Sequence, residues 1–137
     1  MKILITGVAG FMGFNLAKHL LKKKLIVYGI DNYDNYYSIK FKHQRIYQLK
    51  KYINFKFKKI DITNKKSLNK YFLKKKYDFI FHFAAQAGVR YSLINPKKYI
   101  NTNINGFFKY HDKKDNPIRS YRSKILETRL WKRSILM

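Results

Sequence analysis

The sequence predicts an α/β fold, in which a doubly wound parallel sheet of about four strands carries helices on both faces. Short apolar runs, typical of buried parallel strands, alternate with segments whose apolar residues recur at helical spacing. A glycine-rich turn follows the first run, and an acidic residue, Asp31, ends the second. The chain has 137 residues, of which 46% are hydrophobic, so it can form one domain with a modest core.

The glycine-rich turn, residues 6–13, joins an apolar strand at 2–5 to a helical segment at 11–23. Such a turn directs backbone N–H groups and the positive end of the helix dipole at the space above it, where a diphosphate fits. Gly7 allows the tight turn, Gly10 admits the phosphate, and Gly13 lets helix and strand pack closely. The alternative is an ordinary strand–turn–helix unit without a ligand.

Asp31 ends the second apolar run, residues 25–30. A carboxylate at this position accepts hydrogen bonds from a ribose diol and repels a 2′-phosphate, which favours NAD over NADP. In the alternative interpretation, Asp31 is a simple loop carboxylate.

The remaining elements follow in alternation. We expect a basic helix at 39–52 with its apolar positions at Ile39, Phe41, Ile46 and Leu49, and a strand at 55–60 that leads into Asp61. A helix at about 67–75, a central strand at 79–84 and a helix at 97–108 follow. Strands and helices that alternate in this way predict right-handed crossovers between parallel strands.

The strand at 79–84 leads into small residues at 84–88. The carboxyl end of a strand is where an open α/β sheet binds its ligand, and small side chains there leave room for a nicotinamide-ribose. His82 lies within this strand. It is either a catalytic group or a core histidine, and its mid-strand position favours the core.

The formal net charge of +24 suggests nucleic-acid binding as one possible function. However, the lysines occur in short, scattered runs, and the chain is rich in residues encoded by AT-rich codons, so compositional bias explains the charge better. The chain has no Cys, which favours a reducing cytoplasm, and no apolar run reaches the ~18 residues of a membrane span. We therefore expect no specific nucleic acid and no membrane as partners.

These motifs together resemble the extended short-chain dehydrogenase/reductase family, the NAD-dependent epimerases and dehydratases with a Rossmann-type domain. The string His-Phe-Ala-Ala-Gln-Ala-Gly-Val-Arg-Tyr-Ser at 82–92 is similar to UDP-glucuronate 4-epimerases of surface-polysaccharide synthesis. The resemblance covers residues 1–108. It implies NAD as the cofactor and a nucleotide sugar as the substrate, and it leaves the oligomeric state open.

The resemblance also implies site residues. The pyrophosphate would be held by Gly7, Gly10, Phe11, Met12 and Gly13, the adenosine ribose by Asp31 and Asn32, and the adenine by Asp61 and Ile62. The nicotinamide side would be lined by Phe83, Ala84, Ala85, Gln86 and Ala87, with Thr102 as a further NAD contact. Arg90 would hold a uronate carboxylate or a phosphate of the substrate, or it is a surface arginine.

Catalysis in this family requires a tyrosine base, a lysine four residues on that lowers its pKa, and a Ser or Thr hydroxyl. The chain has this Tyr–Lys spacing at several places, among them Tyr36/Lys40, Tyr47/Lys51, Tyr71/Lys75 and Tyr110/Lys114. In a chain with 12 Tyr and many Lys such pairs arise by chance. None has the required strand before it, so we assign no catalytic residue, and we predict no metal site.

The pattern changes after residue 108. We expect an irregular basic tail at 109–137, no fifth strand and no substrate domain, which leaves the strand at 79–84 as an exposed edge. Arginine becomes common in the tail, which suggests a reading-frame change in the gene. The sequence therefore predicts the NAD-binding portion of an epimerase, inactive alone. The alternatives are a module that needs a partner chain, a related dehydratase, or a basic nucleic-acid-binding protein.

Overall fold

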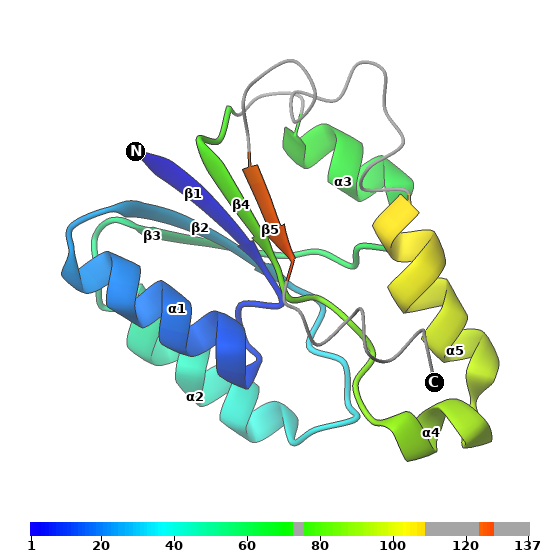
Figure 1. The fold of residues 1–137 in the computed structure, drawn as a ribbon. Coiled ribbons are helices and arrows are strands. Elements are labelled where there is room, and N and C mark those ends of the chain that lie inside the picture. Colours follow the sequence, from blue (N-terminus) through cyan, green and yellow to red (C-terminus); the bar gives the residue numbers. More distant parts are fainter. Residues whose placement is uncertain (73–75, 109–123, 128–137) are drawn as a thin grey trace.

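The computed structural model describes residues 1–72, 76–108 and 124–127 (Figure 1). Its centre is one parallel sheet with the strand order β3-β2-β1-β4-β5. The strands are β1 (Lys2–Thr6), β2 (Ile26–Asp31), β3 (Phe55–Lys59), β4 (Phe79–His82) and β5 (Lys124–Glu127). The predicted parallel sheet and its first four strands are thus confirmed.

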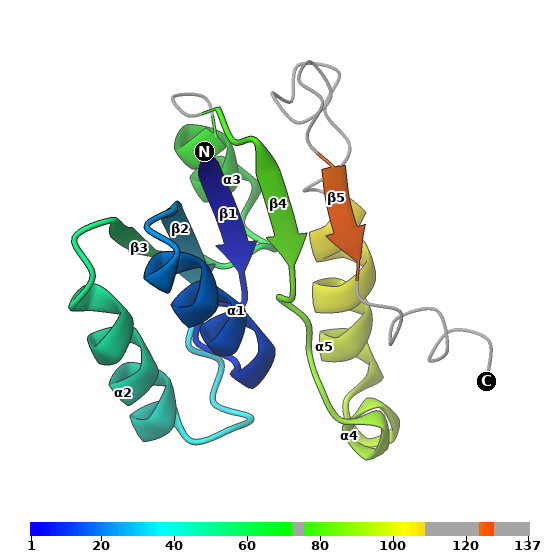
Figure 2. The same ribbon diagram turned by 60° about the vertical axis from the view of Figure 1, so that its left-hand side comes forward.

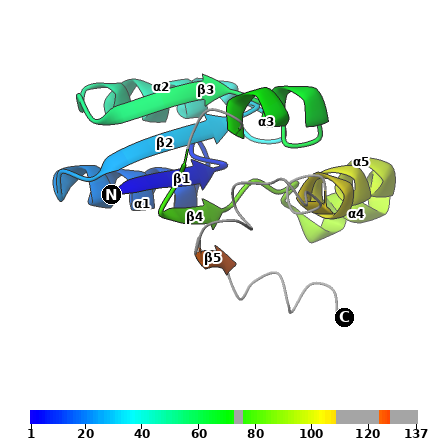
Figure 3. The ribbon, with the colours of Figure 1, turned by 90° about the horizontal axis from the view of Figure 1, so that it is seen from above.

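Helices cover both faces of the sheet. Figure 2 shows α1 (Phe11–Lys22) and α2 (Ile39–Lys50) on one side, and α3 (Lys65–Phe72) on the other. The second side also carries α5 (Pro96–Ile100), which α4 (Val89–Ile94) precedes and the π-helix η1 (Asn101–Gly106) continues. Seen from above, α4 and α5 lie beyond the carboxyl end of β4, where the chain leaves the sheet (Figure 3).

The core has two parts because β1 buries both of its faces. Side chains alternate across a strand, so Ile3 and Ile5 pack with α1 and α2, whereas Leu4 packs with the α3 side. These three residues are almost fully buried. The near-continuous apolar character of β1 therefore follows from its central place in the sheet, which also fixes where its carboxyl end meets the glycine turn.

Helix α2 buries only some of its apolar residues. Ile39 and Phe41 are exposed, Phe41 by 60%, whereas Lys42, Ile46 and Leu49 are buried. The spacing of 42, 46 and 49 is that of one helix face, so the predicted helix is present but its inward stripe begins at a lysine. Of the apolar positions named from the sequence, Ile46 and Leu49 are therefore on the buried face, and Ile39 and Phe41 are not.

Helix α4 was not among the helices expected from the sequence. Its apolar residues Val89, Leu93 and Ile94 are exposed, so no inward stripe marked it in the sequence. The helix expected at 97–108 is present as α5 and η1, with its middle wound as a π-helix. Residues 73–75, the end of the helix expected at 67–75, lie outside the described residues.

The tail contains a strand that the sequence did not predict. β5 pairs in parallel with β4, with Phe79 opposite Lys124 and His82 opposite Glu127. The expectation that β4 forms an uncovered edge was therefore wrong. An apolar edge strand presents unpaired N–H and C=O groups, and an extended segment that supplies the missing partners satisfies them. The rest of the tail, 109–123 and 128–137, lies outside the described residues.

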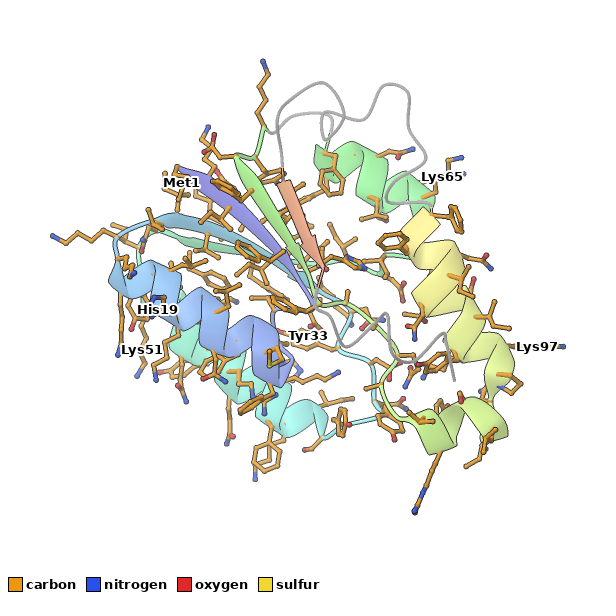
Figure 4. All side chains as sticks on the ribbon, viewed as in Figure 1. Met1, His19, Tyr33, Lys51, Lys65 and Lys97 are labelled. Atoms are coloured by element: carbon orange, nitrogen blue, oxygen red, sulfur yellow. The ribbon has the colours of Figure 1, made fainter. Side chains whose placement is uncertain are left out.

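The lysines are spread over many elements rather than gathered on one. Figure 4 shows Lys51, Lys65 and Lys97 extending outward from different parts of the molecule, and all three are exposed. This distribution fits solvated side chains. No helix within the described parts of the chain has the length and apolar character that crossing a membrane requires.

Candidate functional site

The glycine turn connects the carboxyl end of β1 to α1, as predicted. Gly7 has a φ of +68°, and a Cβ at this position would lie 2.7 Å from the backbone nitrogen of Ala84. Only glycine fits there without strain. The N–H of Gly7 donates to the carbonyl of Ile30 at 2.8 Å, and Gly10 forms the N-cap of α1. The free end of a helix of this length attracts anions.

Asp31 fastens the end of β2 to this turn. Its Oδ2 accepts the N–H of Ala9 at 3.0 Å, and its Oδ1 accepts the N–H of Tyr33 at 2.8 Å. The residue is only 7% exposed, and it lines the hollow above the turn. The carboxylate therefore points into the crevice at the edge of the sheet, where each of its oxygens has further acceptor capacity for a ligand.

Two hollows open at this edge. The larger, about 770 Å³, runs from the glycine turn to the segment after β4, and it contains ten of the predicted cofactor residues: Gly7, Gly10, Phe11, Met12, Gly13, Asp31, Phe83, Ala85, Gln86 and Ala87. The smaller, about 60 Å³, adds Asn32, Ile62, Ala84 and Thr102. The two hollows share the walls formed by Gly7, Asp31, Lys42 and Ala85. The structure thus brings these predicted residues together along one surface.

Asp61 and Arg90 are not part of either lining. Asp61 accepts from the side-chain amide of Asn32 at 2.9 Å and from the backbone N–H of Thr63 at 2.7 Å. It therefore orders the start of the β3–α3 connection, and its predicted contact with adenine stays a prediction. Arg90 is exposed on α4, and its predicted contact with the substrate stays a prediction too.

His82 belongs to a structural network. Its Nδ1 lies 2.8 Å from the hydroxyl oxygen of Thr6, which accepts the backbone N–H groups of Phe83 at 3.2 Å and Ala84 at 3.1 Å. With two donors on that oxygen, the hydroxyl proton is directed to Nδ1. The network joins β1 to the segment that leaves β4. This favours the core interpretation of His82, although the ring also reaches the wall of the larger hollow.

Asn103 is a site residue that sequence reasoning missed. It is 5% exposed within η1, and its Oδ1 accepts the N–H of Gln86 at 2.7 Å while its Nδ2 donates to the carbonyl of Gln86 at 3.1 Å. Both backbone groups of a residue in the wall of the larger hollow are thus held by one side chain. π-Helical turns concentrate at functional sites. The neighbouring apolar residues did not mark this position as inward, because Ile100 and Ile104 are exposed.

Arg45 and Lys42 were missed as well. Arg45 donates from Nη1 to the carbonyl of Ala9 at 3.0 Å, so it braces the glycine turn from α2. Both side chains line the larger hollow. Their signal was helical phase, because positions 42, 45, 46 and 49 lie on one side of α2.

An ion pair connects two segments that flank the larger hollow. Lys98 of α5 lies 2.7 Å from Oδ2 of Asp34, which belongs to the loop between β2 and α2. In the same region the rings of Tyr36 and Tyr91 are 5.0 Å apart. Both flanking segments contribute walls to the larger hollow, so this contact ties its two sides together.

The ion pair predicts a pH dependence. Burial raises the pKa of the Asp34 carboxyl, but the hydrogen bond from Lys98, the N–H of Tyr36 and the charges of Lys98 and Lys42 together lower it below its usual value. The ionised Asp34 carboxylate therefore stabilises the folded state fully above the ordinary aspartate pKa of about 3.9. This contribution is lost as the pH falls through the lower pKa that Asp34 has in the folded state. We expect Asp34→Asn to cost about 1 kcal/mol at pH 7.

The measurement is urea unfolding of the unsubstituted chain and of Asp34→Asn at pH 7 and at pH 3. The difference between their free energies of unfolding should be smaller at pH 3 than at pH 7. A difference that is equal at both values would show that the Asp34 carboxylate contributes nothing through its charge.

The Tyr–Lys pairs add nothing to the site in the described residues. Tyr36, Tyr47 and Tyr71 are not part of the lining of either hollow. Lys75 and the pair Tyr110/Lys114 lie outside the described residues.

A parallel sheet of this strand order, with a glycine turn after the first strand and an acidic residue at the end of the second, defines a Rossmann-type α/β fold. The chain belongs to the family described as GDP-mannose 4,6 dehydratase, whose family model matches residues 4–111. The resemblance to NAD-dependent epimerases and dehydratases is thereby confirmed.

Individual relatives narrow the comparison. The chain is 47% identical over 107 residues to Protein CapI of Staphylococcus aureus. The aligned region covers 78% of this chain and 32% of that protein. It is 46% identical over 103 residues to the UDP-glucuronate 4-epimerase of Thermodesulfobacterium geofontis. That aligned region covers 75% of this chain and 32% of the relative. The chain thus spans about a third of the length of these curated relatives.

The solved structures agree with these relatives. The UDP-glucuronic acid 4-epimerase of Bacillus cereus, solved with UDP-glucuronic acid and NAD, matches with a TM-score of 0.76 and 31% identity. The match covers 91% of this chain and 38% of that one.

Proposed function

We propose that residues 1–108 form an NAD-binding domain, the cofactor-binding portion of a nucleotide-sugar epimerase similar to UDP-glucuronate 4-epimerase. The observation that carries this proposal is the junction of the glycine turn with Asp31, whose carboxylate accepts the N–H of Ala9 beside a continuous hollow. The relatives that carry the epimerase name, and the similar structure solved with NAD, support it.

The residues present fit NAD. A Cβ on Gly7 or Gly13 would fall within 2.9 Å of backbone atoms, so both positions keep the turn closed and leave the space above it to a ligand. In our proposal the N–H groups at the start of α1 bind the pyrophosphate, where the helix dipole adds to their attraction. Asp31 and Asn32 bind the adenosine ribose, Asp61 and Ile62 the adenine. Bound NAD supplies a hydride acceptor for the sugar.

The segment after β4 provides the opposite wall. In this proposal the nicotinamide side is formed by Phe83, Ala84, Ala85, Gln86 and Ala87, and Thr102 is a further NAD contact. The small side chains and the backbone held by Asn103 give a shaped and rigid surface against a flat ring. Arg90 on α4 is the proposed contact for the carboxylate of UDP-glucuronate or a phosphate of the nucleotide, because guanidinium groups bind both in bidentate fashion.

We propose further that this chain does not epimerise sugars on its own. In the described residues, no Tyr–Lys pair of the required spacing contributes to the walls of the larger hollow. Residues 109–137 differ in composition from residues 1–108, although β5 joins the sheet, and in our proposal a changed reading frame accounts for this difference. A partner chain that supplies the catalytic groups would restore activity. The nucleotide sequence after codon 108 tests the frame, and family-like codons in another frame would support the change.

Calorimetry with NAD tests the binding proposal. We expect the chain to bind NAD and Asp31→Asn to weaken binding at least tenfold, because a charged acceptor of a ribose hydroxyl contributes about 1.5–3 kcal/mol. Asp78→Asn is the matched control, since it removes the same charge from an exposed position near the start of β4. Equal affinities of the two variants would refute the role of Asp31.

An activity assay tests the second proposal. The chain is incubated with NAD and UDP-glucuronate, and the products are separated by chromatography. No UDP-galacturonate is expected from the chain alone. Formation of the epimer above the background of a blank reaction would show that the catalytic groups are present.

A further inference from the structure

Helices α4 and α5 contribute a wall to the larger hollow, but they are hardly anchored in the core. On this side the hollow is lined by Gly88, Val89 and Tyr99. Neither helix has a buried residue, and Leu93 and Ile94 of α4 are 83% and 79% exposed. A segment with few buried apolar contacts opens locally at a low cost in free energy. The position of this wall therefore depends on contacts other than core packing.

Four side chains supply such contacts, and we call them the clasp: Asp34 and Tyr36 from the loop between β2 and α2, and Tyr91 and Lys98 from α4 and α5. The ammonium of Lys98 lies 2.7 Å from Oδ2 of Asp34 and 5.7 Å from the centre of the Tyr91 ring. The ring of Tyr91 is in turn 5.0 Å from that of Tyr36. The ion pair and the two rings thus form one connected cluster between the loop and the helices.

Gly88 provides a pivot next to the clasp. It is the N-cap of α4 and has a φ of +94°, a region that other residues rarely adopt. A Cβ on Gly88 would collide with the hydroxyl oxygen of Tyr36, so the clasp lies directly against this residue. Because glycine adopts a wider range of backbone conformations than other residues, rotation at Gly88 can carry α4 away from the loop once the clasp is broken.

The clasp connects the two sides of the hollow without being part of its lining. β1, which leads into the glycine turn, lies between β2 and β4 in the sheet, and the clasp joins the chain that follows β2 to the chain that follows β4. Tyr37 and Val89, which adjoin the clasp segments, line the larger hollow, whereas the four clasp residues line neither hollow. A ligand in the hollow is therefore enclosed by walls that the clasp holds together, and it does not touch the clasp.

We propose that the clasp controls how fast a dinucleotide enters and leaves the larger hollow. This inference rests on the proposed function. The walls separate when the ligand passes and close again around it. Because the clasp residues do not contact the ligand, the clasp is equally stable in the free and in the occupied protein. Breaking it therefore raises the association and the dissociation rate constants together and leaves the affinity unchanged.

A purely supporting role is the competing explanation. The clasp would then only hold the wall in the shape that binds the ligand. Loss of the clasp would remove contacts from the bound ligand, so dissociation would become faster while association stayed the same, and the affinity would fall. The two explanations thus differ in how the effect divides between the two rate constants.

The experiment is stopped-flow fluorescence on the full chain with NADH, whose dihydronicotinamide ring is fluorescent. Lys98→Met is expected to raise both rate constants about threefold, the effect of losing one partly exposed ion pair. Tyr36→Ala should raise both about fivefold, because it removes the ring contact with Tyr91. In both variants the dissociation constant should stay within about twofold of that of the unsubstituted chain.

Lys97→Met is the matched control. Lys97 is exposed on the same helix as Lys98 and extends away from the molecule (Figure 4). The same substitution at this position removes a charge without breaking the clasp. It should change neither rate constant.

Hydrogen exchange without ligand tests the clasp separately from cofactor binding. The N–H of Asn95, which follows α4, donates to the carbonyl of Tyr91 at 2.8 Å. Its protection should fall about threefold in Lys98→Met and persist in Lys97→Met, because opening of the wall exposes this bond to water. Unchanged protection in Lys98→Met would show that the ion pair does not hold α4, which would overturn the inference.

Faster dissociation with unchanged association would overturn the inference in favour of the supporting role, and two unchanged rate constants would overturn it outright. If the unsubstituted chain does not bind NADH although the exchange result is as expected, the clasp holds α4 but the proposed function fails, and control of cofactor exchange fails with it. Circular dichroism establishes that each variant is folded. Lys98→Gln serves in the same comparison if the methionine variant does not fold.

Discussion

Gly13→Ala is expected to destabilise the chain by about 3 kcal/mol, although the same change in an exposed helix would stabilise it by about 1 kcal/mol. Gly13 lies in the first turn of α1, and a Cβ there would meet the carbonyl oxygen of Gly7 and the Cα of Val8, which is 2.8 Å away. Both are backbone atoms, so no side-chain rotation relieves the contact. The helix must move away from the glycine turn, which disturbs the cofactor wall as well as the core.

Guanidinium unfolding followed by circular dichroism measures this loss of stability. Asn15→Ala is the control, because Asn15 is exposed on the same helix and removal of its side chain disturbs no packed backbone. The control should change the free energy of unfolding by less than about 0.5 kcal/mol. If Gly13→Ala is as stable as the unsubstituted chain, the close approach of α1 to the glycine turn is wrong.

The sequence predicted the elements whose residue patterns have a single physical cause. β1 is apolar on both faces because it lies inside the sheet, and the glycines of the first turn are required by backbone contacts that no other residue permits. Asp31 followed from the same logic, since a carboxylate at the end of β2 is adjacent to the turn. Most of the predicted cofactor residues line one surface for this reason.

The sequence did not predict features that depend on tertiary contacts. Lys42 is buried because helical phase carries it under the loop at Asp34, where a carbonyl receives its ammonium. Hydrophobicity alone does not decide which residues face inward, since Phe41 is apolar and yet exposed. β5 pairs with β4 although no continuous apolar run marks it, because the unpaired edge of β4 supplies the driving force. Local pattern reasoning cannot weigh such partners.

Asn103→Leu is expected to cost about 3 kcal/mol, because it removes the side chain that satisfies both backbone groups of Gln86. Gln86 is buried, so its N–H and C=O would each lose a partner without access to water, at about 1–3 kcal/mol for each group. Leucine has a similar volume, and the loss therefore reports the hydrogen bonds rather than a cavity.

The same substitution should also weaken NAD binding, because the backbone of Gln86 forms part of the wall proposed for the nicotinamide side. Asn105→Leu is the matched control, since Asn105 is exposed on the same π-helix. Hydrogen exchange at the Gln86 amide adds a local readout: its protection should fall in Asn103→Leu and persist in Asn105→Leu. Equal stability and equal exchange in the two variants would show that Asn103 does not hold this wall in place, and the rigidity of the site would then need another source.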